Sequence, residues 1–418
     1  MKPGYKQSEV GAIPDEWDVI PLAELFAFRN GVNADKASYG RGVFFVNVLE
    51  PITYSHIYGP EITGRVTLPE SVIASYAVRR GDVLFNRTSE TQEEVALAAT
   101  YLGAERVVFG GFVIRGRPID QRLDPVYSGY ALRAPFIRSQ IIPMGQGAVR
   151  ANVGQRNLGL VVAPLPPLAE QRAIAEALSD VDALLGALDR LIAKKRNLKQ
   201  AAIQQLLTGE TRLPGFSGDR EVKRLGDVAI IRDGTHQTPR YVEFGIPFYS
   251  VEHVTSGDFK NTKYISSEEH RFLSRTSKIE RGDILMTRIG SIGDCKLIDW
   301  DADASFYVSL ALLKIKSGYS AAYVAHYSKS TAFQREVELH SLQSAIPKKI
   351  NLGPISEVKV EFPPFAEQVA IAELLNEMDA ELAALEQRRD KTRALKQGMM
   401  QELLTGRTRL VSPEPVHA

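Results

Sequence analysis

A long internal repeat constrains the fold of this chain more than any other feature of its sequence. The segment PPLAEQRAIAEALSDVDALLGALDRLIAKKRNLKQAAIQQLLTGETRL (166–213) aligns without a gap with PPFAEQVAIAELLNEMDAELAALEQRRDKTRALKQGMMQELLTGRTRL (363–410), and well over half of the positions are identical. Fainter matches in the same order precede each copy, among them GDVLFNRTS (81–89) and GDILMTRIG (282–290). Because a fixed internal period indicates repeated structural units, we expect two copies of one unit.

Each long repeat has the pattern of an amphipathic helix. Its apolar residues step by three and four positions, as in the a/d seam of a coiled coil. They are Ile174, Leu178, Val181, Leu185 and Leu188 in the first copy and Ile371, Leu375, Met378, Leu382 and Leu385 in the second. A double proline precedes each seam and a Thr-Gly pair follows it, as at helix ends. Since two copies of a unit tend to pack around a twofold axis, the seams predict an antiparallel, coiled-coil-like helix pair.

The sequence outside the repeats predicts two globular domains. Short β-rich runs such as VFFVNV (43–48) and DILMTRI (283–289) alternate there with Gly, Pro and polar turns. The expected fold class is α/β (α+β), with small, mixed, largely antiparallel sheets. The predicted boundaries are 1–165 and 214–360 for the domains, 166–213 and 361–410 for the spacer helices, and 411–418 for a C-terminal tail.

Composition narrows the class of protein. Of the 418 residues, 44% are hydrophobic and 24% charged, which is typical of a globular protein in water. The chain has one cysteine, Cys295, so no disulfide framework can form and a reducing cytoplasm is expected. We find no basic-then-apolar start and no apolar run of about 18 residues, and so expect neither a signal peptide nor a membrane span. A net charge of +1 neither indicates nor excludes a nucleic-acid partner.

Motifs that would indicate catalysis are weak. FPPF (362–365) and LPPL (165–168) have the prolines of a DNA amino-methyltransferase loop, but the residue before the prolines is Phe or Leu, which cannot accept a side-chain hydrogen bond. Asp283 followed by Asp294-Cys295-Lys296 has the spacing of some metal-dependent nucleases, yet the first half has no matching lysine. The histidines show no close metal-ligand spacing, and no Ser/His/Asp set stands out. We therefore expect a chain without catalytic residues or a metal site.

The paired motifs resemble a known family. Long helices that begin PPLAEQ or PPFAEQ and end LLTGxTRL, alternating with segments that contain a GDIL-like strand, resemble the DNA-specificity subunit of type I restriction–modification systems. GAIPDEWDVIPLAEL (11–25) and DGTHQTP (233–239) also look like that family, and the likeness covers nearly the whole chain.

The resemblance implies a function and a set of partners. In that family each globular domain is a target-recognition domain for one half of a split site in double-stranded DNA, and the helices set the spacing. The helices also dock two methyltransferase subunits, and restriction/translocase subunits join that core. The specificity subunit itself catalyses nothing and binds no cofactor, so S-adenosylmethionine, ATP and Mg²⁺ are expected to belong to the partner subunits.

The repeat helps to sort candidate DNA-binding residues. Features that both halves share cannot explain how the halves read different sequences, so they suit phosphate contacts or the scaffold. Arg87 and Arg288 match at the end of the GD strand, where Thr88 follows, and Arg29 matches Arg232 before a glycine. Either pair could instead be structural or simply exposed.

Features that differ between the halves suit base recognition. Thr235, His236, Gln237 and Thr238 oppose the unlike residues 32–35, among them Asn33, and their hydroxyl, imidazole and amide groups fit base edges. Two loops that precede the helices add further candidates, which are Gln146, Arg150, Asn152, Lys348, Lys349 and Asn351. On the helices, Lys194, Arg196 and Lys199 match Lys391, Arg393 and Lys396 and could touch DNA or a partner. The alternative for all of these is an ordinary polar surface.

Two other functions remain open from the sequence. The chain could be a pseudosymmetric protein-interaction scaffold without DNA affinity. It could also be a metal-dependent nuclease, which the broken acid–lysine pattern disfavours.

Overall fold

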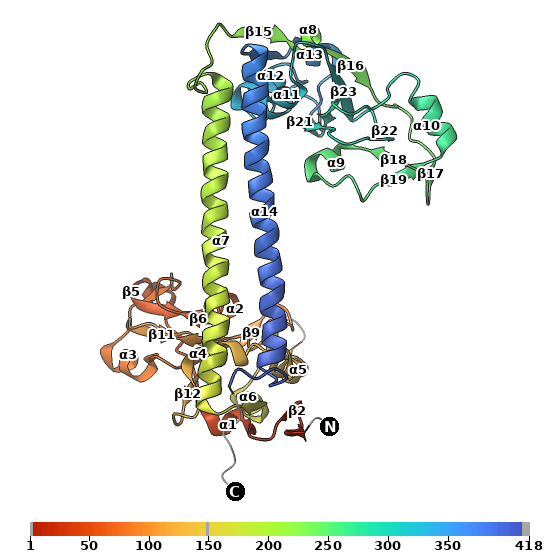
Figure 1. Cartoon of the computed structure of the whole chain (residues 1–418). Coiled ribbons are helices and arrows are strands. Elements are labelled where there is room, and N and C mark those ends of the chain that lie inside the picture. Colours follow the sequence, from red (N-terminus) through yellow and green to blue (C-terminus); the bar gives the residue numbers. More distant parts are fainter. Residues whose placement is uncertain (1–2, 148–149, 412–418) are drawn as a thin grey trace. The chain divides into compact units, whose positions relative to one another are not determined.

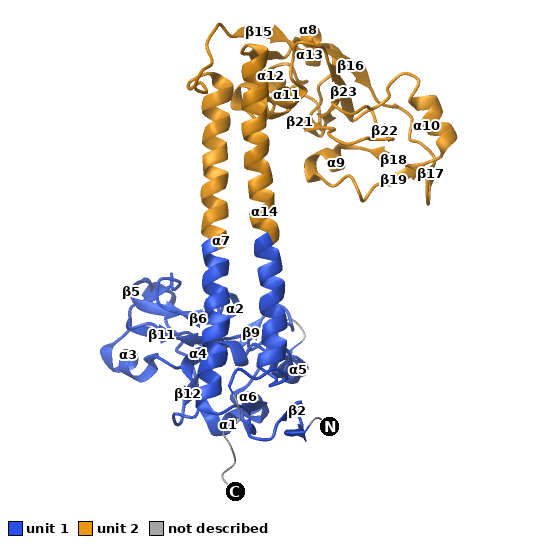
Figure 2. Cartoon of the chain, in the orientation of Figure 1, with its two compact units in different colours: residues 1–187, 388–418 blue, residues 188–387 orange. Residues whose placement is uncertain are grey.

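The computed structural model of the chain describes residues 3–147 and 150–411. It contains two compact units, one formed by residues 1–187 with 388–418 and the other by residues 188–387 (Figure 2). Residues 412–418 of the predicted tail lie outside the described residues, as do Ala148 and Val149 of the first candidate loop. The predicted domain boundaries, which follow the sequence repeat, stay a prediction.

The first unit is built mainly of short strands. In chain order its elements are β1 (Tyr5–Ser8), β2 (Gly11–Pro14), β3 (Asp18–Pro21), α1 (Leu22–Leu25), β4 (Phe26–Asn30), η1 (Lys36–Ser38), β5 (Tyr39–Val46), α2 (Leu49–Thr53), β6 (His56–Ile57), β7 (Arg65–Val66), α3 (Glu70–Tyr76), β8 (Val83–Asn86), β9 (Thr88–Ser89), β10 (Ala98–Tyr101), β11 (Val107–Phe109), β12 (Val113–Pro118), α4 (Pro125–Ala131), α5 (Pro135–Ile141), η2 (Ile142–Met144), β13 (Ala151–Asn152), α6 (Gln155–Leu160) and β14 (Val162–Leu165). Its largest sheet has the order β4-β12-β8-β10-β6, and all neighbours except β10 and β6 are antiparallel. Figure 1 labels β12 and β6 of this sheet.

The second unit repeats this plan with changes. Its elements are β15 (Glu221–Arg224), α8 (Leu225–Val228), β16 (Ala229–Asp233), β17 (Tyr241–Val242), β18 (Ile246–Tyr249), α9 (Val251–Ser256), β19 (Lys263–Ile265), α10 (Ser267–Leu273), β20 (Ile284–Ile289), β21 (Ser291–Leu297), β22 (Ser305–Phe306), β23 (Leu310–Ile315), α11 (Ala321–Tyr327), α12 (Thr331–Leu339), α13 (Leu352–Glu357) and β24 (Lys359–Phe362). The antiparallel sheet β16-β23-β20-β21 has the order of β4-β12-β8-β10 in the first unit. The predicted fold class, with small mixed sheets and an internal repeat, is confirmed.

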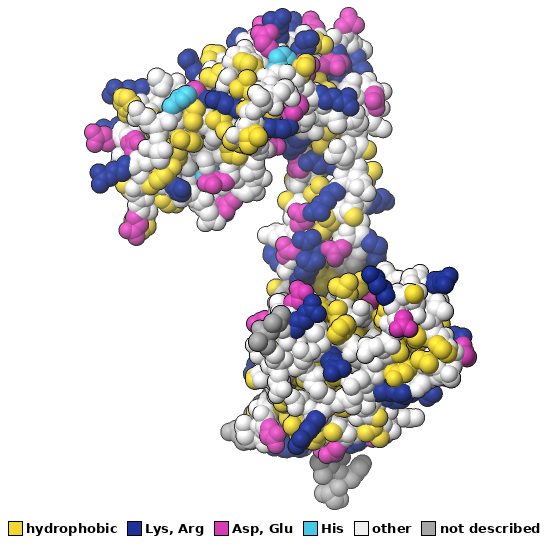
Figure 3. Space-filling view, turned by 180° about the vertical axis from the view of Figure 1, so that it is seen from behind, with side chains coloured by type: hydrophobic (Ala, Val, Ile, Leu, Met, Phe, Trp, Pro, Cys, Tyr) yellow, Lys and Arg dark blue, Asp and Glu magenta, His cyan; other side chains and the backbone are white. Residues whose placement is uncertain are grey.

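Two long helices complete the units. α7 (Leu168–Thr208) and α14 (Phe365–Leu403) each begin directly after the double proline of their repeat, and each contributes one part to either unit. Among the described residues, no helix combines the length and the apolar character that crossing a membrane requires. Acidic and basic side chains intermingle on the helix faces that Figure 3 exposes.

Within each unit the two helix parts run antiparallel. In the second unit, Lys195 on α7 lies 2.6 Å from Glu381 on α14, while Lys199, one turn further along α7, pairs with Asp379. The first unit contains the repeat-related ion pair, Lys396 with Asp182 at 2.6 Å. Arg196 pairs with Glu386 in the same way. Of the basic helix residues considered for DNA, the structure thus places Lys199, Lys396 and Arg196 in helix–helix ion pairs.

The predicted seam residues are all buried or half-buried. Six are buried, namely Ile174, Leu178, Leu188, Ile371, Leu375 and Leu382, and Val181, Leu185, Met378 and Leu385 are half-buried. In the first unit, Ile174 and Leu178 pack with Leu403 and Leu404 at the end of α14 and with Tyr127 of α4. The seam near each helix start is therefore covered twice, by the other helix and by its own globular part.

The repeated AEQ and TRL motifs hold each other. Glu170, in the first turn of α7, is fully buried and accepts hydrogen bonds from Trp17 Nε1 at 2.8 Å and from Arg409 of the second TRL motif. In the second unit, Arg212 of the first TRL motif donates from Nε to fully buried Glu367 at 3.1 Å. A buried carboxylate requires a partner, so each repeat supplies the cation that the other needs.

The glutamines of the same motif attach the helices to the globular parts. Gln171 Oε1 accepts from the backbone N–H of Asp124, just before α4, at 2.8 Å, and Gln368 Oε1 accepts from Ser320, just before α11, at 2.9 Å. Both glutamines are buried. The fold therefore explains why both positions are glutamine, since a backbone N–H that is removed from water needs a hydrogen-bond acceptor.

Candidate nucleic-acid interface

The repeated GD phrase makes a structural turn. Asp82 accepts the backbone N–H of Arg79 at 2.8 Å and pairs with Arg117 of β12 at 2.7 Å. Asp283 accepts the N–H of Glu280 at 2.8 Å and pairs with Lys314 of β23 at 2.6 Å. Each aspartate thus ties its turn to the neighbouring strand.

These ion pairs alter the titration of the cations. The hydrogen bond to Asp82 raises the pKa of Arg117. Burial alone would lower the pKa of Lys314, but hydrogen bonds to Asp283 and Glu280 outweigh burial and raise it. Within the described ranges, no group of three or more His, Cys, Asp or Glu residues could hold a metal ion. Asp283 is therefore bound to a lysine on its own sheet, which it shares with Glu280.

Arg288, at the end of β20, braces the loops of the second unit. The residue is only 3% exposed, its guanidinium lies 2.9 Å from an Asp233 carboxylate oxygen, and its Nε donates to Val308 O at 2.8 Å. Its backbone oxygen accepts from Ile350 N at 3.0 Å. The burial favours the structural alternative for Arg288, because a guanidinium engaged in this way presents little surface to a phosphate.

Three loops meet at this brace, and we call them the loop platform of the second unit: residues 233–239, 307–309 and 342–350. Thr235 lies in the first loop and bonds through its backbone to both Phe306 and Val308, at 3.1 and 2.9 Å. His236 Nε2 is 2.8 Å from the second oxygen of Asp233. The exposed side chains of His236, Gln237 and Thr238 follow directly. Arg288 therefore positions the polar residues predicted for base recognition.

The first unit has an equivalent platform with a weaker brace. Arg87 is half-buried, and its Nη1 lies 3.4 Å from Gly111 O, while its backbone oxygen accepts from Val153 N at 3.1 Å. Asn30 occupies the place that Asp233 has in the second unit. Asn33 is exposed and lies so close to Gly111 that a side chain on that glycine would overlap its amide. The framework is shared, but the groups that it displays differ.

The remaining candidates of the first unit are Gln146, Arg150, Asn152, Thr88 and Arg29. Gln146 and Asn152 pair through their backbones, and Thr88 donates to the Asn152 side chain at 2.6 Å. Arg150 is exposed, 3.9 Å from Glu90. Arg29 lies apart from this group, since its guanidinium donates to Ser75 O at 2.8 Å.

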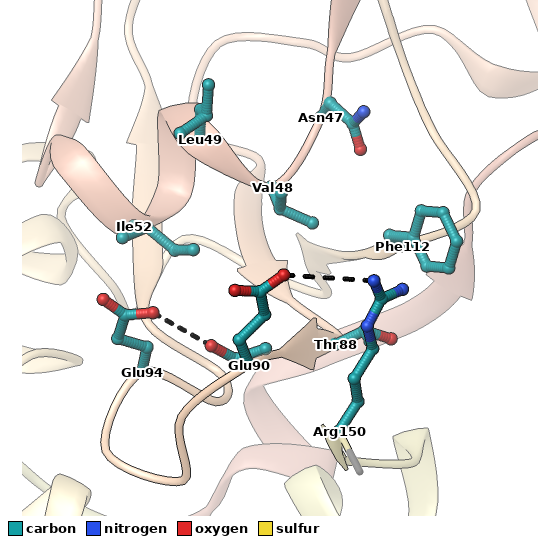
Figure 4. Close-up of a pocket in the computed structure, with 10 residues that line it drawn as sticks. Asn47, Val48, Leu49, Ile52, Thr88, Glu90, Glu94, Phe112 and Arg150 are labelled. Carbon is teal, nitrogen blue, oxygen red and sulfur yellow. Dashed lines mark hydrogen bonds and ion pairs between the residues drawn. The ribbon is translucent and has the colours of Figure 1, made fainter.

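Thr88 and Arg150 border a cavity in the first unit. The cavity has a volume of about 400 Å³ and is lined by Thr88, Arg150, Glu90 and the apolar side chains of Phe112 and Leu49, among others (Figure 4). Phe112 is 52% exposed. Comparing the two halves of the sequence predicted Thr88 and Arg150 as DNA-binding residues. It did not predict Phe112, because a lone aromatic residue in a turn belongs to no motif.

The remaining candidates of the second unit lie on its 342–350 hairpin and around it. Lys348 is exposed and lies 2.7 Å from Glu338, and Lys349 is half-buried and pairs through its backbone with both Leu342 and Ile289. Asn351 is exposed at the start of α13. Arg232, on β16, is also exposed.

The structure also assembles a serine, a histidine and an aspartate that the sequence had not singled out. His270 Nδ1 is 2.9 Å from Ser305 Oγ, and its Nε2 is 3.0 Å from Asp303. Ser305 is only 3% exposed, whereas the Asp303 side chain is 72% exposed. A nucleophile must reach its substrate and its orienting acid must be held in place, so this set fits a structural role.

Comparison with known proteins agrees with the geometry. The model of the type I restriction modification DNA specificity domain matches residues 218–393. The type I restriction enzyme MjaVIII specificity subunit of Methanocaldococcus jannaschii is 25% identical, over 97% of this chain and 96% of its own length. The EcoKI specificity subunit of Escherichia coli is 23% identical, over 69% of this chain and 65% of its own length. Residues 218–393 therefore contain a type I restriction modification DNA specificity domain, and the chain is similar to type I restriction enzyme specificity subunits along nearly its whole length.

The fold agrees with this similarity. The crystal structure of a type I restriction-modification S subunit from M. genitalium superposes with a TM-score of 0.61 at 17% identity, covering 96% of this chain and 99% of that one. The segment 218–393 matched by the family model contains the whole loop platform of the second unit and the first part of α14.

Proposed function

We propose that this chain is the non-catalytic DNA-reading specificity subunit of a type I restriction–modification complex, with one half of a bipartite target read by each unit. The observation that carries the proposal is the pair of loop platforms. Arg87 and Arg288 brace equivalent loops, yet the side chains displayed beside them are unlike. Two domains that recognise different DNA sequences require the same loop framework with different polar side chains on it.

Two recognition domains in one chain have a physical advantage over a single domain. A single domain reaches only a few base pairs along one groove, and two domains joined by helices can read two separate patches. Each mismatched base pair costs about 1–3 kcal/mol, so a second reader multiplies discrimination. Because the two platforms differ, the target need not be palindromic.

The helix pair is proposed to set the distance between the halves and to carry the partners. The cross-helix ion pairs and the buried Glu170 and Glu367 fix the register of α7 against α14 within each unit. A helix pair of fixed register suits a spacer. We propose that its outer faces dock two methyltransferase subunits, that restriction/translocase subunits join them, and that the assembly works in the cytoplasm.

Chemistry and cofactors are assigned to the partners. Methylation and cleavage belong to partner subunits, and S-adenosylmethionine, ATP and Mg²⁺ are proposed to bind there. Two features of this chain support the assignment: Asp283 is held by Lys314, and Ser305 is buried.

Methylation mapping tests the function directly. The chain is expressed with the methyltransferase of its own system in a host without other methylation, and modified bases are mapped by single-molecule sequencing. We expect two short specified sequences around an unspecified gap, absent when the chain is deleted. Methylation that continues unchanged without the chain would overturn the role and leave a protein scaffold as the better interpretation.

A domain exchange tests the assignment of the halves. Replacing residues 214–360 by the corresponding segment of a relative should change one half of the motif and leave the other half unchanged. A change in both halves would contradict independent readers.

A further inference from the structure

The 342–349 hairpin of the second unit is a short, firmly held projection. Leu342 N donates to Lys349 O at 2.8 Å, and Gly290 N, just after β20, donates to Lys348 O at 2.8 Å. Ile350 follows at the base, fully buried and bonded to Arg288. The hairpin is therefore attached both to the central sheet and to the brace of the loop platform.

An aliphatic side chain stands at the tip of this hairpin. Ile346 is 99% exposed, more than any other large apolar side chain that the structure describes. Exposed single hydrophobic residues are common on proteins, but most keep part of their surface against a neighbour. The side chain of Ile346 packs against almost nothing in its own unit, so its apolar surface is available for burial by a binding partner.

The surroundings of the tip favour DNA as that partner. Lys348 and Lys349 follow within three residues, and cations at this spacing suit the phosphates that flank a groove. Through Arg288 and Asp233, the same brace holds the loop that displays His236 and Gln237. The apolar tip thus projects from a platform of side chains suited to base edges.

We propose that Ile346 contacts the C5-methyl group of a thymine in the major groove of the half-site that the second unit reads. This inference rests on the proposed function and adds an apolar contact to it. On the base edges of the major groove, the thymine methyl is the apolar group, and aliphatic side chains recognise it by contact. The attachment at Lys348, Lys349 and Ile350 fixes the hairpin before binding, so little additional ordering is needed when the contact forms.

The experiment removes the methyl group and the side chain separately. The full complex with its methyltransferase is prepared, its motif is mapped, and each thymine of the second unit's half-site is replaced in turn by deoxyuridine. We expect one replacement to weaken binding about fourfold, the ratio for burying one methyl-sized group at about 0.8 kcal/mol.

Variants complete a cycle with the modified DNA. Ile346→Ala should lose about as much affinity on thymine DNA and should no longer distinguish the critical deoxyuridine. Ile346→Thr keeps the branched shape at the backbone and should give an intermediate loss. Val222→Ala, which shortens a 63% exposed aliphatic side chain on β15, is the matched control and should discriminate as the wild type does.

Each contrary result has a distinct meaning. A half-site without thymine, or a deoxyuridine effect that persists in Ile346→Ala, overturns the methyl contact. An Ile346→Ala variant that binds DNA normally but assembles poorly with the methyltransferase assigns the tip to a protein partner instead. A wild-type complex with no bipartite motif overturns the proposed function itself, and this inference with it.

Discussion

Arg409, close to the end of the second repeat, donates a hydrogen bond from Nε to the carboxylate of Glu170, in the first turn of the first repeat. The two residues are 239 positions apart in sequence, and Glu170 is fully buried. Arg212 and Glu367 form the equivalent pair in the other unit. A motif that begins with Glu and ends with Arg is therefore complementary to a second copy of itself in antiparallel orientation.

Removing the arginine should destabilise the first unit. Arg409→Met leaves the Glu170 carboxylate buried with Trp17 as its remaining donor, and breaking a buried pair on one side costs about 3–5 kcal/mol. Since the Arg409 side chain is 17% exposed, we expect the lower end of that range in urea unfolding. Arg106→Met breaks a pair whose side chains are 63% and 74% exposed and should cost less than about 1 kcal/mol. Equal losses in the two variants would contradict a special role for the buried pair.

The cross-helix pair of Asp182 and Lys396 predicts a charge-reversal rescue. Asp182→Lys should destabilise the chain, because it faces Lys396 and removes the acceptor of the Tyr130 hydroxyl at 2.8 Å. Lys396→Asp should also destabilise it, and the double variant should recover part of the loss. Contacting residues couple by about 0.5–3 kcal/mol, which thermal unfolding of the four proteins can measure. Additive losses without recovery would mean that the two residues do not interact.

The sequence predicted the helices well because each carries its own local pattern. The steps of Ile174, Leu178 and Val181 predict a helical face without knowledge of what covers it. By contrast, nothing local to Glu170 indicates a partner at Arg409, since that contact depends on the antiparallel arrangement. The repeated AEQ and TRL motifs could be seen in the sequence, but the ion pair that explains them could not.

The candidate interface was predictable only in part. Comparing the halves drew attention to Arg288 and to the 233–239 loop, and the structure places them together through Asp233. Burial decides what Arg288 does, and burial cannot be read from a matching pair of arginines. Phe112 and Ile346 carried no motif, and their exposure became visible only in the fold.

Two buried histidines predict a loss of stability in mild acid. Burial lowers the pKa of both His56, in the first unit, and His326, in the second. A folded pKa below the unfolded value of about 6.5 means that the unfolded chain binds more protons in that range. Their contribution is therefore fully present above about pH 6.5 and is lost as the pH falls through the folded pKa.

Urea unfolding as a function of pH measures this contribution. His326→Gln keeps a donor for Asn376 Oδ1, which lies 2.8 Å from the ring Nε2, but cannot be charged. Its stability should fall less between pH 7 and pH 5.5 than that of the wild type, and His56→Gln should reduce the fall further. Between pH 7 and pH 8 the pH lies above both the folded and the unfolded pKa of these histidines, so the variants should nearly parallel the wild type there. An unchanged acid slope in the double variant would exclude these histidines as its cause.

Arg288 should control recognition by one unit alone. Arg288→Met leaves the Asp233 carboxylate without its guanidinium and removes the side-chain hydrogen bonds to Val308 O and Ile350 O, which loosens the 233–239 and 307–309 loops, while the backbone bond from Ile350 N to Arg288 O remains. We expect the half-site of the second unit to lose discrimination at one or more positions, each about 1–3 kcal/mol, while the other half-site stays specified. Arg288→Lys keeps the charge but not the planar fork, so it should restore little.

The matched variant in the first unit is Arg87→Met, which should relax the opposite half-site. Its effect should be smaller, because Arg87 is half-buried and Asn30 stands where the second unit has Asp233. Methylation maps of the two variants in the full complex measure both effects at once. If either variant relaxed both halves, or if both abolished methylation while the chain remained folded, the braces would not act on separate readers. A separate effect of each arginine on its own half would link one bracing side chain to one half of the target.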